Sequence, residues 1–172
     1  RYWAPLVAVF SGMRASEIGA LSAKCLSSVE IDGKVYWYLA VDDSKTKAGI
    51  RDVPVHPGLI DLGFLEFCLS RANREGRLFE EWHKPKGKKF SEARVIRNFN
   101  DTVCASIGAP GNRPTFHCFR HTMQSAMIDA ELSDPIQKAI LGHEQDGMKE
   151  HYFKPNISNY AKKFCERVSF SE

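Results

Sequence analysis

One short segment brings basic and aromatic side chains close together: Thr115-Phe116-His117-Cys118-Phe119-Arg120-His121. His117 and Arg120 are three positions apart, which places them on one face if the segment is helical. The first turn of a helix favours an anion, because its backbone N–H groups are free and its dipole is positive there. An arginine fork beside an imidazole then suits a phosphate group. Taken alone, such a pair is more often an exposed arginine next to a capped core histidine.

Four further places in the chain carry residues of the same chemical kind. Arg14 begins a helix after a break, and Glu17 lies three positions on, where it can hold the guanidinium in place. Taken alone, that pair can equally be a surface ion pair of little energetic value. Each of the other three places also has an ordinary structural interpretation, as a C-capping histidine, a half-buried aromatic residue or a solvated turn. They are His143 after Leu141-Gly142, Tyr152 nine residues later, and the lysine pair Lys45 and Lys47.

The N-terminal third predicts two helices and three strands that would position these residues. Helices are expected at 2–10 and 15–21, and strands at 29–31, 35–41 and 50–55. Asp32-Gly33 between the first two strands is a strong signal for a tight hairpin. Residues 42–49 then form the second turn of a three-stranded antiparallel sheet, with Lys45 and Lys47 at its tip.

The remainder of the chain is mostly helical in pattern. Apolar residues keep helical spacing at Leu62, Leu65 and Leu69, from 96 to 107, and from 119 to 130, with Thr115 as an N-cap before the last of these. Asp134-Pro135 opens another helix and Gly142 closes it. An apolar stripe at 157–168 predicts a terminal helix. The predicted fold class is α+β, mainly α-helical with a small three-stranded antiparallel sheet.

Composition places the chain among folded globular proteins. It has 172 residues, 43% of them hydrophobic, which fits one domain with a sizeable core. No apolar run approaches the ~18 residues that a membrane span needs. The net charge of +3 is too mild to predict nucleic-acid binding, so any such role depends on where the charges lie. Five scattered cysteines (25, 68, 104, 118 and 165) indicate reduced thiols in a cytosol.

Taken in chain order, these motifs are far more specific than any one of them alone. The order Arg14, Lys45, His117-x-x-Arg120, Leu-Gly-His143 and Tyr152 resembles the catalytic domain of the tyrosine recombinase (phage integrase) family. The resemblance runs over nearly the whole chain and includes the stretch Lys-Thr-Lys-Ala-Gly-Ile-Arg-Asp-Val-Pro. It implies the fold of DNA breaking-rejoining catalytic domains over residues 1–172.

The resemblance also implies a role for each residue. Arg14 and Arg120 match the two arginines that clamp the phosphate, His143 matches the later histidine, and Tyr152 matches the nucleophile. The remaining matches are His117 as the proton acceptor, Lys45 as the proton donor with Lys47 as a register alternative, and Glu17 and His121 as supporting residues. Phe119 stands where the family usually has leucine, a mild departure.

The implied reaction is cleavage and rejoining of double-stranded DNA through a 3′-phosphotyrosine, without ATP, metal or other cofactor. The implied partners are DNA, three further copies of the protein in a tetramer on DNA, and accessory DNA-bending proteins, in the cytoplasm of a bacterial or phage-infected cell. Basic residues from 84 to 97 are candidates for the DNA-facing surface, with a solvated loop as an equal alternative for 84–89. The family's preceding DNA-gripping domain is expected to lie outside this chain. Residues 157–172 are expected either to pass to a neighbouring protomer or to fold back on their own.

Three other interpretations compete with this one. A type IB topoisomerase-like enzyme would share the phosphotyrosine chemistry but relax supercoils without partners. A zinc hydrolase could use His117, His121, His143 and Cys118, although Arg120 between the first two would repel a cation. A DNA-binding module that has lost its activity is the third, and it is disfavoured because every catalytic position is filled.

Overall fold

The computed structural model describes residues 2–42, 47–71, 75–79, 99, 101, 116–144 and 156–170. The first helix, α1 (Trp3–Ser11), ends at Gly12, whose φ of 64° is left-handed, and α2 (Ala15–Ala20) follows at once. Glu17 reaches back to accept a hydrogen bond from the backbone N–H of Arg14 at 2.8 Å, which caps α2. The two predicted N-terminal helices are therefore present within one residue of their expected ends.

A short 3₁₀ turn, η1 (Ala23–Cys25), leads into the predicted three-stranded antiparallel sheet of order β1-β2-β3. The strands are β1 (Leu26–Ile31), β2 (Lys34–Val41) and β3 (Arg51–Pro54). Asp32 and Gly33 join the first two strands with φ of 52° and 74°, as a two-residue hairpin requires. A second 3₁₀ turn, η2 (Lys47–Gly49), precedes β3. Leu39 pairs with Leu26 on one side and Val53 on the other, so one row of buried side chains crosses the sheet.

The helical segment after the sheet differs from its sequence-based prediction. The spacing of Leu62, Leu65 and Leu69 predicts one apolar face, but the chain forms two short helices, α3 (Pro57–Asp61) and α4 (Phe64–Leu69). Gly63, with φ of 90°, separates them and changes the direction of the chain. Leu62 and Leu69 are consequently 45% and 55% exposed, and α4 buries Phe64 and Cys68 instead.

Three later helices complete the described part of the chain: α6 (Cys118–Asp129), α7 (Asp134–Leu141) and α9 (Ile157–Arg167). Gly142 ends α7 as predicted, with φ of 70°. The residue before α6 is His117, so this helix begins later than an N-cap at Thr115 predicts. Thr115 itself and the helix expected between 96 and 107 lie largely outside the described residues.

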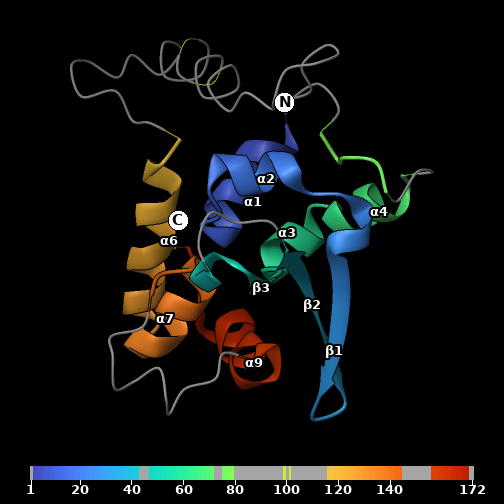
Figure 1. The fold of residues 1–172 in the computed structure, drawn as a ribbon. Helices are drawn as coiled ribbons and strands as arrows, with labels where there is room; N and C mark the ends of the chain where they lie inside the picture. Colours follow the sequence, from blue (N-terminus) through green and yellow to red (C-terminus); the bar gives the residue numbers. More distant parts are fainter. Residues whose placement is uncertain are drawn as a thin grey trace.

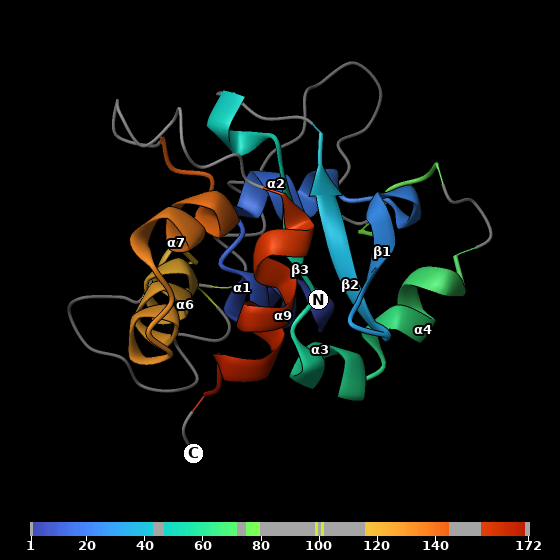
Figure 2. The ribbon, with the colours of Figure 1, turned by 90° about the horizontal axis from the view of Figure 1, so that it is seen from below.

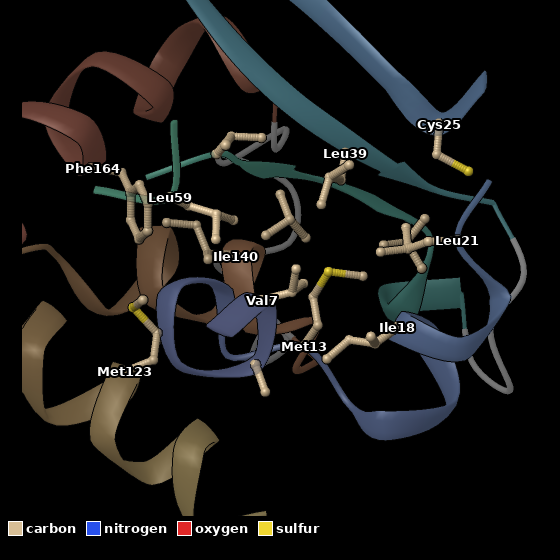
Figure 3. Close-up of a cluster of buried hydrophobic side chains, with 14 of the residues drawn as sticks. Val7, Met13, Ile18, Leu21, Cys25, Leu39, Leu59, Met123, Ile140 and Phe164 are labelled. Carbon is tan, nitrogen blue, oxygen red and sulfur yellow. The ribbon is translucent and has the colours of Figure 1, made fainter. Parts of the chain in front are cut away.

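Helix α1 lies at the centre of the fold, in contact with α2, α3 and α6, while α7 contacts α6 and the β3 strand (Figure 1). Helix α9 lies against all three strands of its own chain (Figure 2). The core between these elements is apolar (Figure 3), and its labelled members include Val7, Met13, Leu39, Ile140 and Phe164. No helix among the described residues is long and apolar enough to cross a membrane.

Helix α9 is held on the sheet by polar contacts as well as by its apolar face. Tyr160 donates its hydroxyl hydrogen to the carbonyl oxygen of Asp52 at 2.6 Å, and burial raises the pKa of that phenol well above its ordinary value. At the end of the helix, Nε2 of the buried His56 ring lies 2.9 Å from the carbonyl oxygen of Val168. Its Nδ1 accepts the N–H of Gly58 at 3.1 Å, so Nε2 carries the hydrogen and donates it to Val168.

The burial of His56 predicts that the fold loses stability as the pH falls below about 6.5, the ordinary pKa of histidine. Burial lowers the pKa of His56, and its bond to Val168 and the charge of Asp61 only partly oppose this. Above that pH both folded and unfolded chains hold a neutral His56. Below it the unfolded chain binds the proton first, which favours unfolding.

Urea unfolding at pH 7.5 and pH 5.5 measures the effect, with His56→Asn as the matched variant that keeps the cap on Gly58 but does not titrate. The variant should lose less free energy of unfolding between the two pH values than the wild type. His117 and His143 also titrate in this range but are common to both proteins. Equal losses in the two proteins would contradict the role given to His56.

Candidate active site at the end of helix α7

The end of α7 is covered by arginine side chains from three distant parts of the chain. Arg51 donates from Nε to the carbonyl oxygen of Ile140 at 2.7 Å. Arg120 donates from Nη2 to the carbonyl of Leu141, and Arg14 donates from Nη2 to that of Gly142 at 3.4 Å. The last carbonyls of a helix lack partners within the helix and lie at its negative end. Three consecutive carbonyls therefore bring three cationic side chains to one place.

The carboxylate of Glu17 lies between two of these arginines. Arg14 Nη1 donates to Glu17 Oε1 at 2.8 Å, which is the ion pair expected from the sequence. Arg51 forms a bidentate ion pair with Glu17, in which Nη1 donates to Oε1 at 2.9 Å and Nη2 donates to Oε2 at 3.0 Å. Burial alone would raise the pKa of Glu17, but its bonds to Arg51 and Arg14 outweigh this and lower it. Glu17 is therefore ionised and fully hydrogen-bonded at neutral pH.

The two arginines singled out from the sequence play different structural parts. Arg120 is only 4% exposed, and its Nη1 also donates to the carbonyl of Gly12 at 2.8 Å. Burial, and then the charges of Arg14 and Arg51, lower the pKa of Arg120 to about 10. The side chain of Arg14, by contrast, is 37% exposed. Arg120 therefore forms the buried floor of the site, whereas the Arg14 side chain is partly open to solvent.

Two exposed histidines lie beside this cluster. The backbone N–H of His143 donates to the carbonyl oxygen of Lys138 at 3.0 Å, which fixes the turn after α7. The pKa of His143 is lowered by partial burial and then by Arg120, Arg14 and Arg51. The pKa of His117, just before α6, is lowered by partial burial and then by His121, Arg120 and Arg14. Both imidazoles are thus predominantly neutral at pH 7, and His117 is able to accept a proton.

Gly142 permits the close approach between the end of α7 and Arg51. A Cβ atom on Gly142 would lie 2.8 Å from Nη1 of Arg51 and 3.0 Å from its Cζ. The residue also needs a left-handed φ of 70°, which a side chain disfavours. A glycine is therefore required here on two separate physical grounds.

The structure thus brings Arg14, Glu17, Arg120 and His143 together, with His117 and His121 at the first turn of α6 next to Arg120. The ring centroids of the latter two histidines are 5.1 Å apart, edge to face. Lys45 and Tyr152 lie outside the described residues, as do the basic residues from 84 to 97, and the backbone alone of Lys47 is described, in η2.

Arg51 is the member of this cluster to which the sequence analysis gave no role. A signal was present, because Arg51 is two positions from Val53 in the predicted strand and so lies on the same face as that buried apolar residue. A charged residue at an inward position of a strand needs a buried partner, and here that partner is Glu17.

Among the described residues, no group of three or more histidine, cysteine, aspartate or glutamate side chains is placed to hold a metal ion. The residues weighed for zinc, His117, His121, His143 and Cys118, all belong to the described set. What the cluster offers is positive charge, because it contains three guanidiniums and one carboxylate. Such a cluster is complementary to an anion carrying several oxygen atoms.

Comparison with known proteins assigns the chain to a class. A profile of the phage integrase family matches residues 2–158. The crystal structure of XerA recombinase shares the fold, with a TM-score of 0.53 and 18% sequence identity, over 96% of this chain and 55% of that one. A search of curated proteins gave no match.

The family match and the shared fold together define a tyrosine recombinase domain. The chain belongs to the phage integrase family, as its motifs predicted.

The packing of Gly142 predicts that Gly142→Ala destabilises the fold more than the same change at Gly33. Gly33 has nearly the same φ, 74°, but a Cβ there would meet nothing within 4 Å. Gly33→Ala should therefore show only the backbone penalty of about 1 kcal/mol. Gly142→Ala should add about 1 kcal/mol or more for the contact with Arg51. Urea unfolding of both variants measures the difference, and equal losses would show that the end of α7 can move away from Arg51.

The histidine pair predicts that His121→Gln raises the pKa of His117. A protonated His121 disfavours a second proton on the neighbouring ring, and the substitution removes that charge. An NMR titration of the imidazole signals measures the effect. His143 serves as the internal reference, because the cations that lower its pKa are Arg120, Arg14, Arg51 and Lys138. A His117 titration that is identical in both proteins would refute the coupling.

Proposed function

We propose that this chain is the catalytic domain of a site-specific DNA recombinase that cuts and rejoins double-stranded DNA through a phosphotyrosine, for the integration or excision of a phage or other mobile element. The observation that carries the proposal is the convergence of Arg14 and Arg120 on neighbouring carbonyls at the end of α7, beside His143. Segments distant in sequence meet there to form a cationic site. A DNA phosphodiester is an anion of suitable charge and geometry for it.

In the proposed reaction, Tyr152 Oη attacks the phosphorus of one DNA strand. A new Oη–P bond forms, the P–O5′ bond breaks, and the products are a 3′-phosphotyrosyl link and a free 5′-hydroxyl. The phenol proton passes to His117, whose lowered pKa keeps it neutral and receptive. The leaving 5′ oxygen takes a proton from Lys45, with Lys47 as the alternative. Attack by a 5′-hydroxyl of another strand reverses the step.

Electrostatic stabilisation would supply much of the rate. Negative charge builds up on the non-bridging oxygens of the phosphorus in the transition state. Arg14 meets these oxygens from its exposed position, Arg120 contributes its charge from the floor of the site, and His143 adds a hydrogen bond. The bond energy stays in the phosphotyrosine, so the proposal requires neither ATP nor a metal ion.

The proposed partners are double-stranded DNA and further copies of the chain in a tetramer on that DNA, with accessory DNA-bending proteins. Within a single chain, α9 packs on its own sheet. Exchange of residues 157–172 between protomers would replace these contacts by equivalent ones with a neighbour.

The test is covalent capture of DNA from a pool of nicked duplexes of random sequence, so that no target site has to be chosen. The chain is incubated with the pool in the presence of EDTA and then denatured in detergent. Wild type should form a protein–DNA adduct that mass spectrometry identifies as phosphotyrosine at Tyr152. Tyr152→Phe should form none, and Arg14→Lys should slow the reaction by about 100-fold or more. Tyr2→Phe, at an exposed tyrosine near the N-terminus, should react as wild type does.

The same adducts distinguish the recombinase from a type IB topoisomerase-like enzyme. Sequencing of the captured duplexes should return one common sequence for a recombinase. Adducts at unrelated sequences, together with relaxation of any supercoiled plasmid by the chain, would favour the topoisomerase. No adduct with any duplex, or an adduct that survives Tyr152→Phe, would contradict both.

A further inference from the structure

Arg51 connects three segments of the site with one buried side chain. Its Nε donates to the carbonyl oxygen of Ile140 at 2.7 Å, and its Nη1 donates to that of Gly49 at 2.8 Å. Nη1 and Nη2 together hold both oxygens of Glu17, at 2.9 and 3.0 Å. One guanidinium on β3 therefore touches the end of α7, the end of η2 and Glu17 in the first turn of α2.

This side chain is placed where it cannot meet DNA. The side chains of Arg51 and Glu17 are only 3% and 4% exposed. Four N–H···O contacts at normal distances occupy the fork of Arg51. Its contribution to the proposed reaction must therefore act through the residues that it holds.

Stability alone is a weak explanation for such a pair. Removing two charges from water is unfavourable, and replacing a buried ion pair with apolar residues is often neutral or stabilising. What the pair does supply is geometry, because a planar fork fixes the direction of each partner as well as its distance. Gly142 packs directly against the Arg51 guanidinium, which limits the positions that the fork can take.

We propose that Arg51 is a positioning residue for DNA strand cleavage, and this inference rests on the proposed function of the site. Through Glu17 it sets the direction of the guanidinium of Arg14, whose side chain is partly exposed. Through Ile140 it fixes the end of α7, and so the turn that carries His143. Through Gly49 it anchors the end of η2, which begins at Lys47 and follows Lys45 in the sequence. Loss of the fork would let these groups shift relative to one another while the DNA-facing surface stays the same.

The test separates DNA binding from the cleavage step. Arg51→Lys keeps the positive charge but loses the fork. Glu17→Gln combined with Arg51→Met removes both buried charges and so avoids an unpaired carboxylate if the single variant folds poorly. Arg71→Met is the matched control, since Arg71 is a half-buried arginine that donates to a backbone carbonyl, Leu78 at 3.1 Å, away from the site.

Each variant is measured for affinity to the duplex pool and for the rate of adduct formation at saturating DNA. Arg51→Lys and the double variant should bind DNA within about 2-fold of wild type yet cleave about 100-fold more slowly, since an error of ~1 Å in placement has that effect. Arg71→Met should retain both values after correction for the folded fraction. A full rate in Arg51→Lys would overturn the proposal, as would losses of rate matched by losses of affinity.

A second readout does not depend on cleavage. The ¹⁵N relaxation of the Arg14 side-chain Nε–H, identified by its loss in Arg14→Lys, reports how firmly the guanidinium is held. It should be rigid in wild type and mobile in Arg51→Lys. If wild type forms no adduct, the proposed function fails but this measurement still decides the role of Arg51. An equally rigid Arg14 in both proteins would refute that role.

Discussion

The hydrogen-bonding requirement of one helix end organises the site. Helix α7 stops at Leu141, which leaves its last carbonyl oxygens without partners inside the helix. Three consecutive carbonyls, of residues 140, 141 and 142, accept N–H groups from Arg51, Arg120 and Arg14 in turn. These donors come from β3, from α6 and from the start of α2. Satisfying this one helix end therefore joins the elements that must meet for the site to exist.

The same arrangement concentrates positive charge in one place, which suits a site for an anion. Three guanidiniums repel one another, and the pKa of Arg120 falls to about 10 under burial and the charges of its two neighbours. Glu17 offsets part of this repulsion, through bonds to Arg14 and Arg51, and the negative end of the helix dipole offsets more. A positive balance remains, and a bound phosphate would relieve it. In the proposed reaction, the folded chain would thus hold in advance the charge that the transition state needs.

Local sequence signals predicted most of the elements but not the contacts between them. The Asp32-Gly33 turn and the Pro135-to-Gly142 frame act over a few residues, and each is present in the structure. The division of this segment into two helices at Gly63 was not predicted, because helical spacing does not show which apolar residues pack into the core. Chain order indicated the family, yet the burial of Arg120 and the part played by Arg51 depend on partners from distant segments. No local pattern reports such partners directly.

The apolar core and the charged site are parts of one packing arrangement. Gly12 ends α1 with a left-handed φ, and a Cβ there would come within 2.8 Å of Leu141 Cδ2 and 3.0 Å of Met123 Cγ. Its carbonyl oxygen accepts the second N–H of Arg120. The close contact of α1 with α6 and α7 therefore sets the distance from the floor arginine to the helix end that it covers. A side chain at position 12 would push these helices apart. Because protein interiors are close-packed, the shift of the helices would also displace Arg120. The position of the site's charges is thus fixed by apolar contacts that bear no charge themselves.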